Sequence, residues 1–202
     1  AVMGPNANDS VMQWGNYNGT PKRTITILDG IRSAMGKDDK LIYEQGCSWV
    51  ERKLIRSVFS QCKSENGPGF SARYWNNTEF KGEPAATAQL STPFHLCTSG
   101  ATVFAPGVNL TDFSATYNSV LTPLQSGEVV FEIYTYGSGC LRINGEEVKR
   151  FRNTHGGRSL DYTLQVKAGV PYDIELDFEY FRSDAQLNFD IGFKQKVNID
   201  AS

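Results

Sequence analysis

Side chains that could bind a sugar are the most informative chemistry in this sequence. Pyranose rings stack their C–H faces on flat aromatic side chains, and sugar hydroxyls need hydrogen-bonding partners. Aromatic residues make up 12% of the chain, which supplies many flat faces. The candidate carbohydrate-binding residues are Trp14, Trp75, Tyr136, Phe151, Arg152 and His155.

For the first three candidates, sugar binding has to be weighed against a purely structural role, and the balance differs among them. Trp75 follows Tyr74 near a predicted strand, and core packing is the favoured explanation for it. Trp14 opens the segment WGNYN, which favours a loop packed against another domain. Tyr136 alternates with apolar positions of a predicted strand, and this spacing predicts an exposed ring.

The other three candidates follow a predicted hairpin. Phe151 and Arg152 are balanced between sugar contact and ordinary surface. His155 lies in the segment RNTHGG, a predicted loop tip, and an ordinary surface role is favoured there. Loops nevertheless carry binding residues more often than cores do, so all three stay candidates.

Catalytic and cofactor motifs do not stand out. No G-x-S-x-G elbow occurs, although the composition leaves a Ser-His-Asp triad open. The glycines at 137–139 lack the G-x-G-x-x-G frame of a phosphate-binding loop. We therefore expect no catalytic residue and no cofactor in this chain.

Metal binding is not expected either. His95 and His155 are the two histidines of the sequence, too few for a histidine-rich site. Cys47, Cys62, Cys97 and Cys140 lie far apart without a C-x-x-C pair, which argues against zinc. Buried thiols and disulfides both remain open for these cysteines.

The overall composition argues against two classes of partner, nucleic acids and membranes. The chain has 202 residues, a net charge of −2 and a pI of about 5.7. It lacks the basic surface that nucleic acid requires and any apolar run long enough to cross a membrane. No signal peptide is recognised, and the first residues, AVMGPN, resemble a strand end taken from a longer chain.

The first third of the chain has the pattern of an α/β protein. Thr26-x-x-Asp29 is a capping box that predicts a helix up to about residue 35, followed by a short strand at 41–43. Ser48-x-x-Glu51 predicts a second helix that continues through Phe59. Residues 1–62 therefore form an incomplete α/β segment, too small to cover both faces of a parallel sheet.

The rest of the chain alternates between apolar and polar residues with a period of two. A segment rich in turn formers at 63–69 is expected to be a linker. After it, segments such as YDIELDFEY at 172–180 predict half-buried strands, and Asn144-Gly145 predicts a tight hairpin. We expect a mostly β protein, with an antiparallel β-sandwich or barrel at 68–194.

Three ordered motifs of this second part resemble a known module. YWNNTEFKGEP, LTPLQSGEVVFEIYTYGSGCLRINGEEV and VKAGVPYDIELDFEYF resemble the protective-antigen-type β-sandwich, or PA14 module. This module occurs in glycosidases, fungal adhesins and bacterial toxins. The first part, with TILDGIRSAMG and IYEQGC, resembles the opening of the α/β sandwich domain of glycoside hydrolase family three. Some β-glucosidases of that family carry a PA14 module inserted in that domain.

The resemblance implies a noncatalytic role. In family three the nucleophile belongs to a barrel domain, and the acid/base glutamate usually follows the insertion. Neither motif is matched in this sequence, so the resemblance implies that this chain does not catalyse.

The resemblance also bears on calcium. In adhesins, adjacent aspartates help hold calcium at positions that match Tyr136 and Gly137 here, and these two residues cannot replace carboxylate ligands.

Three functions follow as hypotheses. The leading one is a noncatalytic accessory module that shapes substrate access to the active site of a β-glucosidase-like enzyme. The alternatives are an autonomous carbohydrate-binding module and a structural or protein-interaction module. The expected partners are an oligosaccharide or glycan and the missing barrel domain, in the periplasm or outside the cell.

Overall fold

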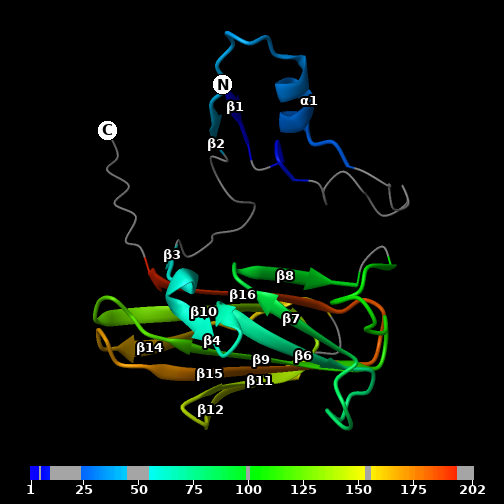
Figure 1. The fold of residues 1–202 in the computed structure, drawn as a ribbon, viewed down its shortest axis with the longest axis vertical. Coiled ribbons are helices and arrows are strands. Elements are labelled where there is room, and N and C mark those ends of the chain that lie inside the picture. The colour runs from blue at the N-terminus through cyan, green and yellow to red at the C-terminus, as the bar shows by residue number, and fades with distance from the viewer. Residues whose placement is uncertain (5, 10–23, 45–54, 99–100, 153–155, 195–202) are drawn as a thin grey trace. The chain divides into compact units, whose positions relative to one another are not determined.

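A computed structural model describes residues 1–4, 6–9, 24–44, 55–98, 101–152 and 156–194. The chain divides into two compact units, Ala1–Lys53 and Leu54–Ser202. Among these described residues, the first unit contains an α-helix, and the second is built of strands (Figure 1). No helix in the described part of the chain is long and apolar enough to span a membrane.

The first unit begins with the predicted combination of helix and strand. β1 (Val2–Met3) pairs in parallel with β2 (Tyr43–Glu44), and α1 covers Ile27–Ala34. The capping box is confirmed, because Thr26 Oγ1 accepts from the Asp29 N–H at 3.1 Å and the Asp29 carboxylate accepts from the Thr26 N–H at 3.3 Å. Of the helix residues, Leu28 is buried.

The predicted second helix is wrong where the structure describes it, from residue 55 onward. Ile55–Ser57 forms strand β3, and Phe59–Gln61 is a single 3₁₀ turn, η1. β3 pairs with β16, and the Val58 N–H donates to the Ile191 carbonyl at 2.8 Å. Val58 and Phe59 enter the sandwich core instead of lining a helix face. The proposed start of this helix, Ser48 to Glu51, lies outside the described residues.

The second unit is an antiparallel β-sandwich, which confirms the predicted fold class. In the part of the chain that the structure describes, one sheet has six strands: β3, β8 (Phe94–Cys97), β10 (Gly127–Tyr136), β13 (Arg158–Ser159), β14 (Tyr162–Val166) and β16 (Gln186–Lys194). The other has eight: β4 (Cys62–Ser64), β5 (Gly67–Pro68), β6 (Phe70–Trp75), β7 (Ala86–Leu90), β9 (Phe113–Leu121), β11 (Ser138–Ile143), β12 (Glu146–Phe151) and β15 (Tyr172–Tyr180).

The segment 63–69, predicted as a linker, is instead part of the eight-stranded sheet. Lys63 pairs with Val120 of β9 and with Pro68 of β5. The turn formers that suggested a linker serve the tight turn between β4 and β5, where Gly67 has a φ of 135°.

The core between the two sheets follows the predicted alternation. β15 directs Ile174, Leu176, Phe178 and Tyr180 into the core, and the acidic residues between them point outward. Aromatic rings pack across the interior, with Phe94 stacked on Tyr117 at 4.9 Å and Phe70 edge-on to Phe189 at 5.4 Å between ring centroids.

The corner and the hairpin of the PA14-like motif carry the chain from one sheet to the other. β10 belongs to the six-stranded sheet and β11 to the eight-stranded sheet, with Gly137 between them. The predicted hairpin is confirmed, because Asn144 and Gly145 have φ values of 52° and 80° and join β11 to β12.

Candidate functional site

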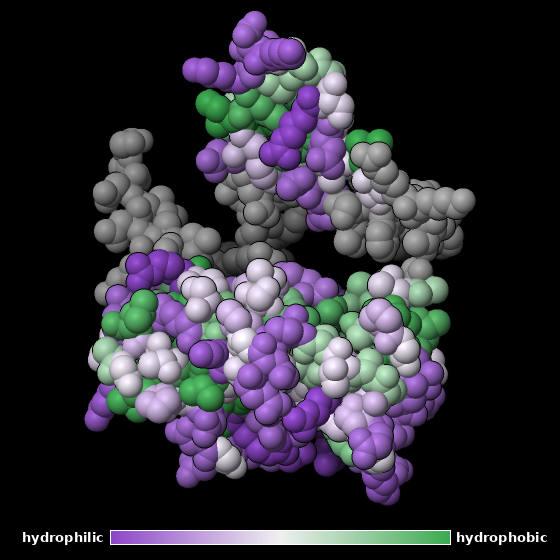
Figure 2. Space-filling view, in the orientation of Figure 1, coloured by the Kyte–Doolittle hydropathy of each residue, from purple (hydrophilic) through white to green (hydrophobic). Residues whose placement is uncertain are grey.

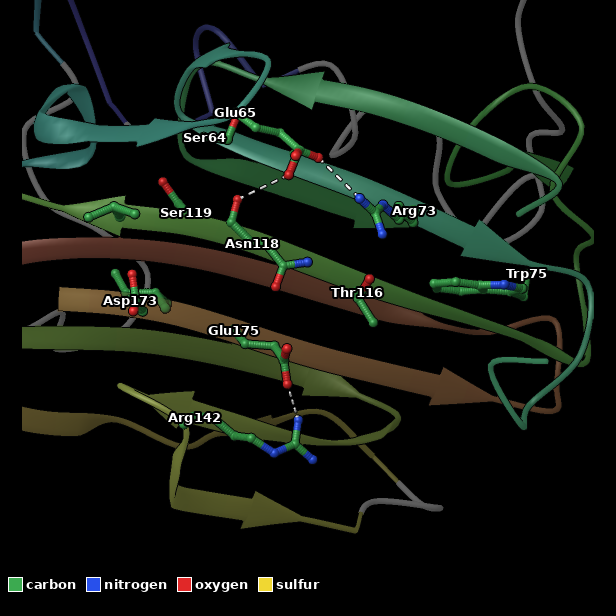
Figure 3. A pocket seen from close by; sticks show the side chains of 14 residues that line it. Ser64, Glu65, Arg73, Trp75, Thr116, Asn118, Ser119, Arg142, Asp173 and Glu175 are labelled. Carbon is green, nitrogen blue, oxygen red and sulfur yellow. Dashed lines mark hydrogen bonds and ion pairs between the residues drawn. The ribbon is translucent and has the colours of Figure 1, made fainter. Parts of the chain in front are cut away.

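The outer face of the eight-stranded sheet, turned away from the core, is hollowed in two adjoining places. The larger depression has a volume of about 630 Å³ and the smaller about 320 Å³, and Arg142 lines both. We call the two together the outer groove. Figure 3 shows the larger depression, with Thr116 and Asn118 in the middle and Trp75 at one end.

The strand register brings polar residues of five strands together in this groove. One row across the sheet reads Ser71, Asn118, Glu175, Arg142 and Glu147, and the next reads Arg73, Thr116, Asp177, Cys140 and Arg150. Each strand contributes alternate residues, because successive side chains of a strand point to opposite faces. The same alternation that builds the core therefore builds the groove.

Ion pairs hold the charged side chains of the groove in place. Arg73 pairs with Glu65 at 3.1 Å, and Arg150 pairs with Glu147. Arg142 bridges Glu175 and Asp177 on β15. Figure 3 shows the Arg73–Glu65 and Arg142–Glu175 pairs on opposite sides of Thr116. These two ion pairs, which we call the clamps, thus lie on either side of the uncharged residues Thr116 and Asn118, which we call the floor of the groove.

Partial burial affects the pKa values of the clamp that contains Arg142. Hydrogen bonding to Asp177 raises the pKa of Arg142 above its already high ordinary value. Burial raises the pKa of Asp177, and the hydrogen bond from Arg142 opposes that shift. Because Arg142 bridges Glu175 and Asp177, these residues place hydrogen-bond donors and acceptors at the junction of the two depressions.

Three of the predicted residues border this groove, and they do so in different ways. Trp75 is 9% exposed and lies on the outer face, where its Nε1–H donates to the Gly82 carbonyl at 2.9 Å. Phe151 is 4% exposed and belongs to the core, so its predicted place on an exposed loop is wrong; it is the last residue of β12 and borders the smaller depression. Arg152 is exposed beside it.

The remaining predicted residues do not join them. Tyr136 is half-buried on the six-stranded sheet and packs edge-on against Tyr180, with 5.8 Å between ring centroids. Trp14 and His155 lie outside the described residues. The structure thus brings Trp75 and Arg152 to the outer groove, leaves Phe151 in the core at the edge of the smaller depression, and places Tyr136 elsewhere.

The residues that form most of the groove were not among the sequence candidates. Arg73, Asn118, Arg142 and Glu175 are polar positions of alternating strands, and that alternation is visible in the sequence. What joins them is the pairing of β6, β9, β15 and β11, which no local pattern reveals.

The corner before the hairpin is filled by core packing. A Cβ atom added at Gly137 would overlap the ring of Phe178. Within the described residues, no group of three or more His, Cys, Asp or Glu side chains is placed to hold a metal ion. The described cysteines, Cys62, Cys97 and Cys140, are free thiols, and Cys47 lies outside the described residues.

A polar cluster on the six-stranded sheet contains the three residue types of a Ser-His-Asp triad. Ser57 Oγ donates directly to Asp190 Oδ1 at 2.7 Å, and His95 lies close enough to Asp190 to affect the pKa of that carboxyl. In a triad the hydroxyl must instead donate to the histidine. This cluster therefore lacks the order of a nucleophilic site.

Comparison with known proteins identifies the family of the sandwich. The sequence profile described as the PA14 domain matches residues 66–190. The chain belongs to the PA14 domain family. The resemblance inferred from the three sequence motifs is thereby confirmed.

The relatives of this PA14 domain include glycosidases. A xylan 1,4-beta-xylosidase of Xylanibacter ruminicola is 36% identical over 205 residues, which cover 99% of this chain and 23% of that protein. A beta-glucosidase of Rhizobium radiobacter is 28% identical over 155 residues, covering 73% of this chain and 17% of that protein. The chain thus spans less than a quarter of the length of these curated relatives.

Solved structures agree on the fold. A beta-glucosidase from Kluyveromyces marxianus matches 96% of this chain and 25% of its own length, with a TM-score of 0.59 and 16% identity. An alpha-xylosidase from Xanthomonas citri matches 70% of this chain and 19% of its own length, with a TM-score of 0.50 and 14% identity.

Proposed function

We propose that this chain is a noncatalytic, carbohydrate-associated part of a glycoside hydrolase of family three, of the β-glucosidase or β-xylosidase kind. In that enzyme the PA14 domain shapes substrate access to the active site. The enzyme acts in the periplasm or outside the cell, and its barrel domain is the partner of this chain.

The observation that carries the proposal is the extent of the similarity to the xylosidase. It covers 99% of this chain, so both units occur together in a protein named for cleaving xylan. The exposed apolar side chains of the first unit, including Met3, Ile25, Ile27 and Ile42, also fit a unit completed by further chain.

Arg152 is the residue best suited to test the role in access. It is exposed and borders the smaller depression, whereas truncation of the buried Phe151 would disturb the core. In the whole enzyme, Arg152→Ala should change the ratio of kcat/KM for xylobiose to kcat/KM for xylohexaose severalfold, because an access residue contacts longer substrates more than short ones.

Arg158→Ala is the matched control, since Arg158 is an exposed arginine on the six-stranded sheet. It should leave the ratio unchanged. An unaltered ratio in Arg152→Ala would contradict a role of this edge of the PA14 domain in substrate access.

A further inference from the structure

The outer groove has the length of an extended ligand. Its polar rows cross β6, β9, β15, β11 and β12, which are neighbours in one sheet. Four spacings between strands, at about 4.8 Å each, give roughly 19 Å. A short oligosaccharide fits this length, whereas a single small metabolite would occupy only one depression.

The charges of the groove nearly cancel. Among the described residues that line it, four arginines (Arg73, Arg142, Arg150 and Arg152) face five carboxylates (Glu65, Asp173, Glu175, Asp177 and Glu179). Three of the arginines are already bound to carboxylates within the sheet or its edge. A polyanion would meet these carboxylates, and a polycation would meet the arginines.

The groove offers donors and acceptors side by side, as sugar hydroxyls require. Each hydroxyl both donates and accepts, and an arginine–carboxylate pair presents both functions to it. Thr116 and Asn118 add a hydroxyl and an amide on the floor between the two clamps. Trp75 and Phe80, whose ring centroids are 5.9 Å apart, give the groove an apolar side wall.

The surface around the groove is hydrophilic. In Figure 2 polar residues gather along the lower side of the second unit, where Figure 1 shows β11, β12 and β15. A ligand that binds there must compete with water through hydrogen bonds instead of apolar burial.

We propose that the outer groove binds a neutral, extended oligosaccharide across the strands of the eight-stranded sheet; the expectation that its linkage is β-1,4 rests on the proposed function. This goes beyond the proposed role in substrate access, because it gives the chain a binding site of its own. Arg73, Asn118 and the Arg142–Glu175 clamp contact the sugar hydroxyls, and the Trp75–Phe80 pair flanks the ligand along one side.

The test is calorimetric titration of the chain with xylohexaose and, separately, with cellohexaose. We expect saturable binding of at least one hexamer. Arg73→Ala and Asn118→Ala should each weaken it about tenfold, whereas Arg158→Ala on the other sheet should bind as the wild type does. Thermal melting of each variant verifies that it is folded.

Amide chemical shifts from NMR locate the site directly. Titration should perturb β6, β9 and β15 and leave β8 and β14 of the six-stranded sheet unmoved. Failure of both hexamers to bind at millimolar concentration would overturn the proposal. So would perturbations confined to the six-stranded sheet, or preferential binding of hexagalacturonic acid that salt abolishes.

These outcomes separate the two proposals. If the chain binds no hexamer but the substrate preference of the whole enzyme still depends on Arg152, the proposed binding site in the outer groove is contradicted and the proposed function is supported. If the chain binds a hexamer but Arg152→Ala leaves the substrate preference unchanged, the binding site is supported and the role in substrate access is contradicted.

Discussion

Asp190 illustrates how a single residue on the six-stranded sheet responds to its surroundings. Its carboxylate accepts hydrogen bonds from Ser57 Oγ and from the Ile191 N–H, both at 2.7 Å. Burial nevertheless raises the pKa of Asp190 above its ordinary value. The folded protein therefore binds a proton at this site more tightly than the unfolded chain does.

This shift gives stability a dependence on pH. An aspartate in the unfolded chain has a pKa of about 3.9, so the contribution of Asp190 is full below that value and falls as the pH rises through the higher folded pKa. Asp190→Asn removes the ionisation. Its melting temperature relative to the wild type should therefore be more favourable at about pH 7 than at about pH 4.

Glu83→Gln is the control for this measurement, because Glu83 is an exposed carboxylate on the same unit. Its difference from the wild type should stay the same at both pH values. A constant difference for Asp190→Asn as well would show that burial does not govern this carboxyl.

Individual candidates were only partly predictable from the sequence. The aromatic character of Trp75 and Phe151 made both look suitable for sugar binding, but the structure buries most of each side chain. Composition reports what a side chain can do, whereas its exposure depends on packing with residues far away in the chain, such as Ser114 of β9, which pairs with Trp75.

At the level of elements, the corner between β10 and β11 determines how the chain changes sheets. Gly137 lies against Phe178, which the core holds fully buried. Gly137→Ala should lower the free energy of unfolding by about 1–3 kcal/mol, because the new methyl group must displace this ring. Chemical denaturation measures the change.

Gly30→Ala is the comparison for this substitution, since nothing lies within 4 Å of a Cβ added there in α1. It should leave stability unchanged or slightly raise it, because alanine favours a helix more than glycine does. An equally small effect at Gly137 would contradict the packing role of the corner.

Local signals predicted some elements well and others poorly. The capping box of α1 and the Asn144-Gly145 hairpin depend on neighbouring residues, and both are confirmed. The apolar spacing of residues 55–59 predicts a helix. Pairing of β3 with β16, more than 130 residues later, overrides that preference, and a local pattern contains no trace of it.

At the scale of the whole molecule, one sheet serves two purposes. Its inner face closes the core with residues such as Leu176 and Phe178, and its outer face carries the charged rows of the groove. The sequence predicts that such strands have a polar face, but the charges that meet across strands depend on register. The groove could therefore not be predicted, although every residue in it alternates as expected.

We propose that this chain serves a glycosidase without itself cleaving glycosidic bonds. The most direct measurement is the rate at which the chain alone hydrolyses an aryl β-xyloside and an aryl β-glucoside, with the whole enzyme assayed beside it. We expect turnover by the whole enzyme and none by the chain. Turnover by the chain that Glu175→Gln or Asp177→Asn abolishes would contradict it, because the carboxylates of the groove would then be catalytic.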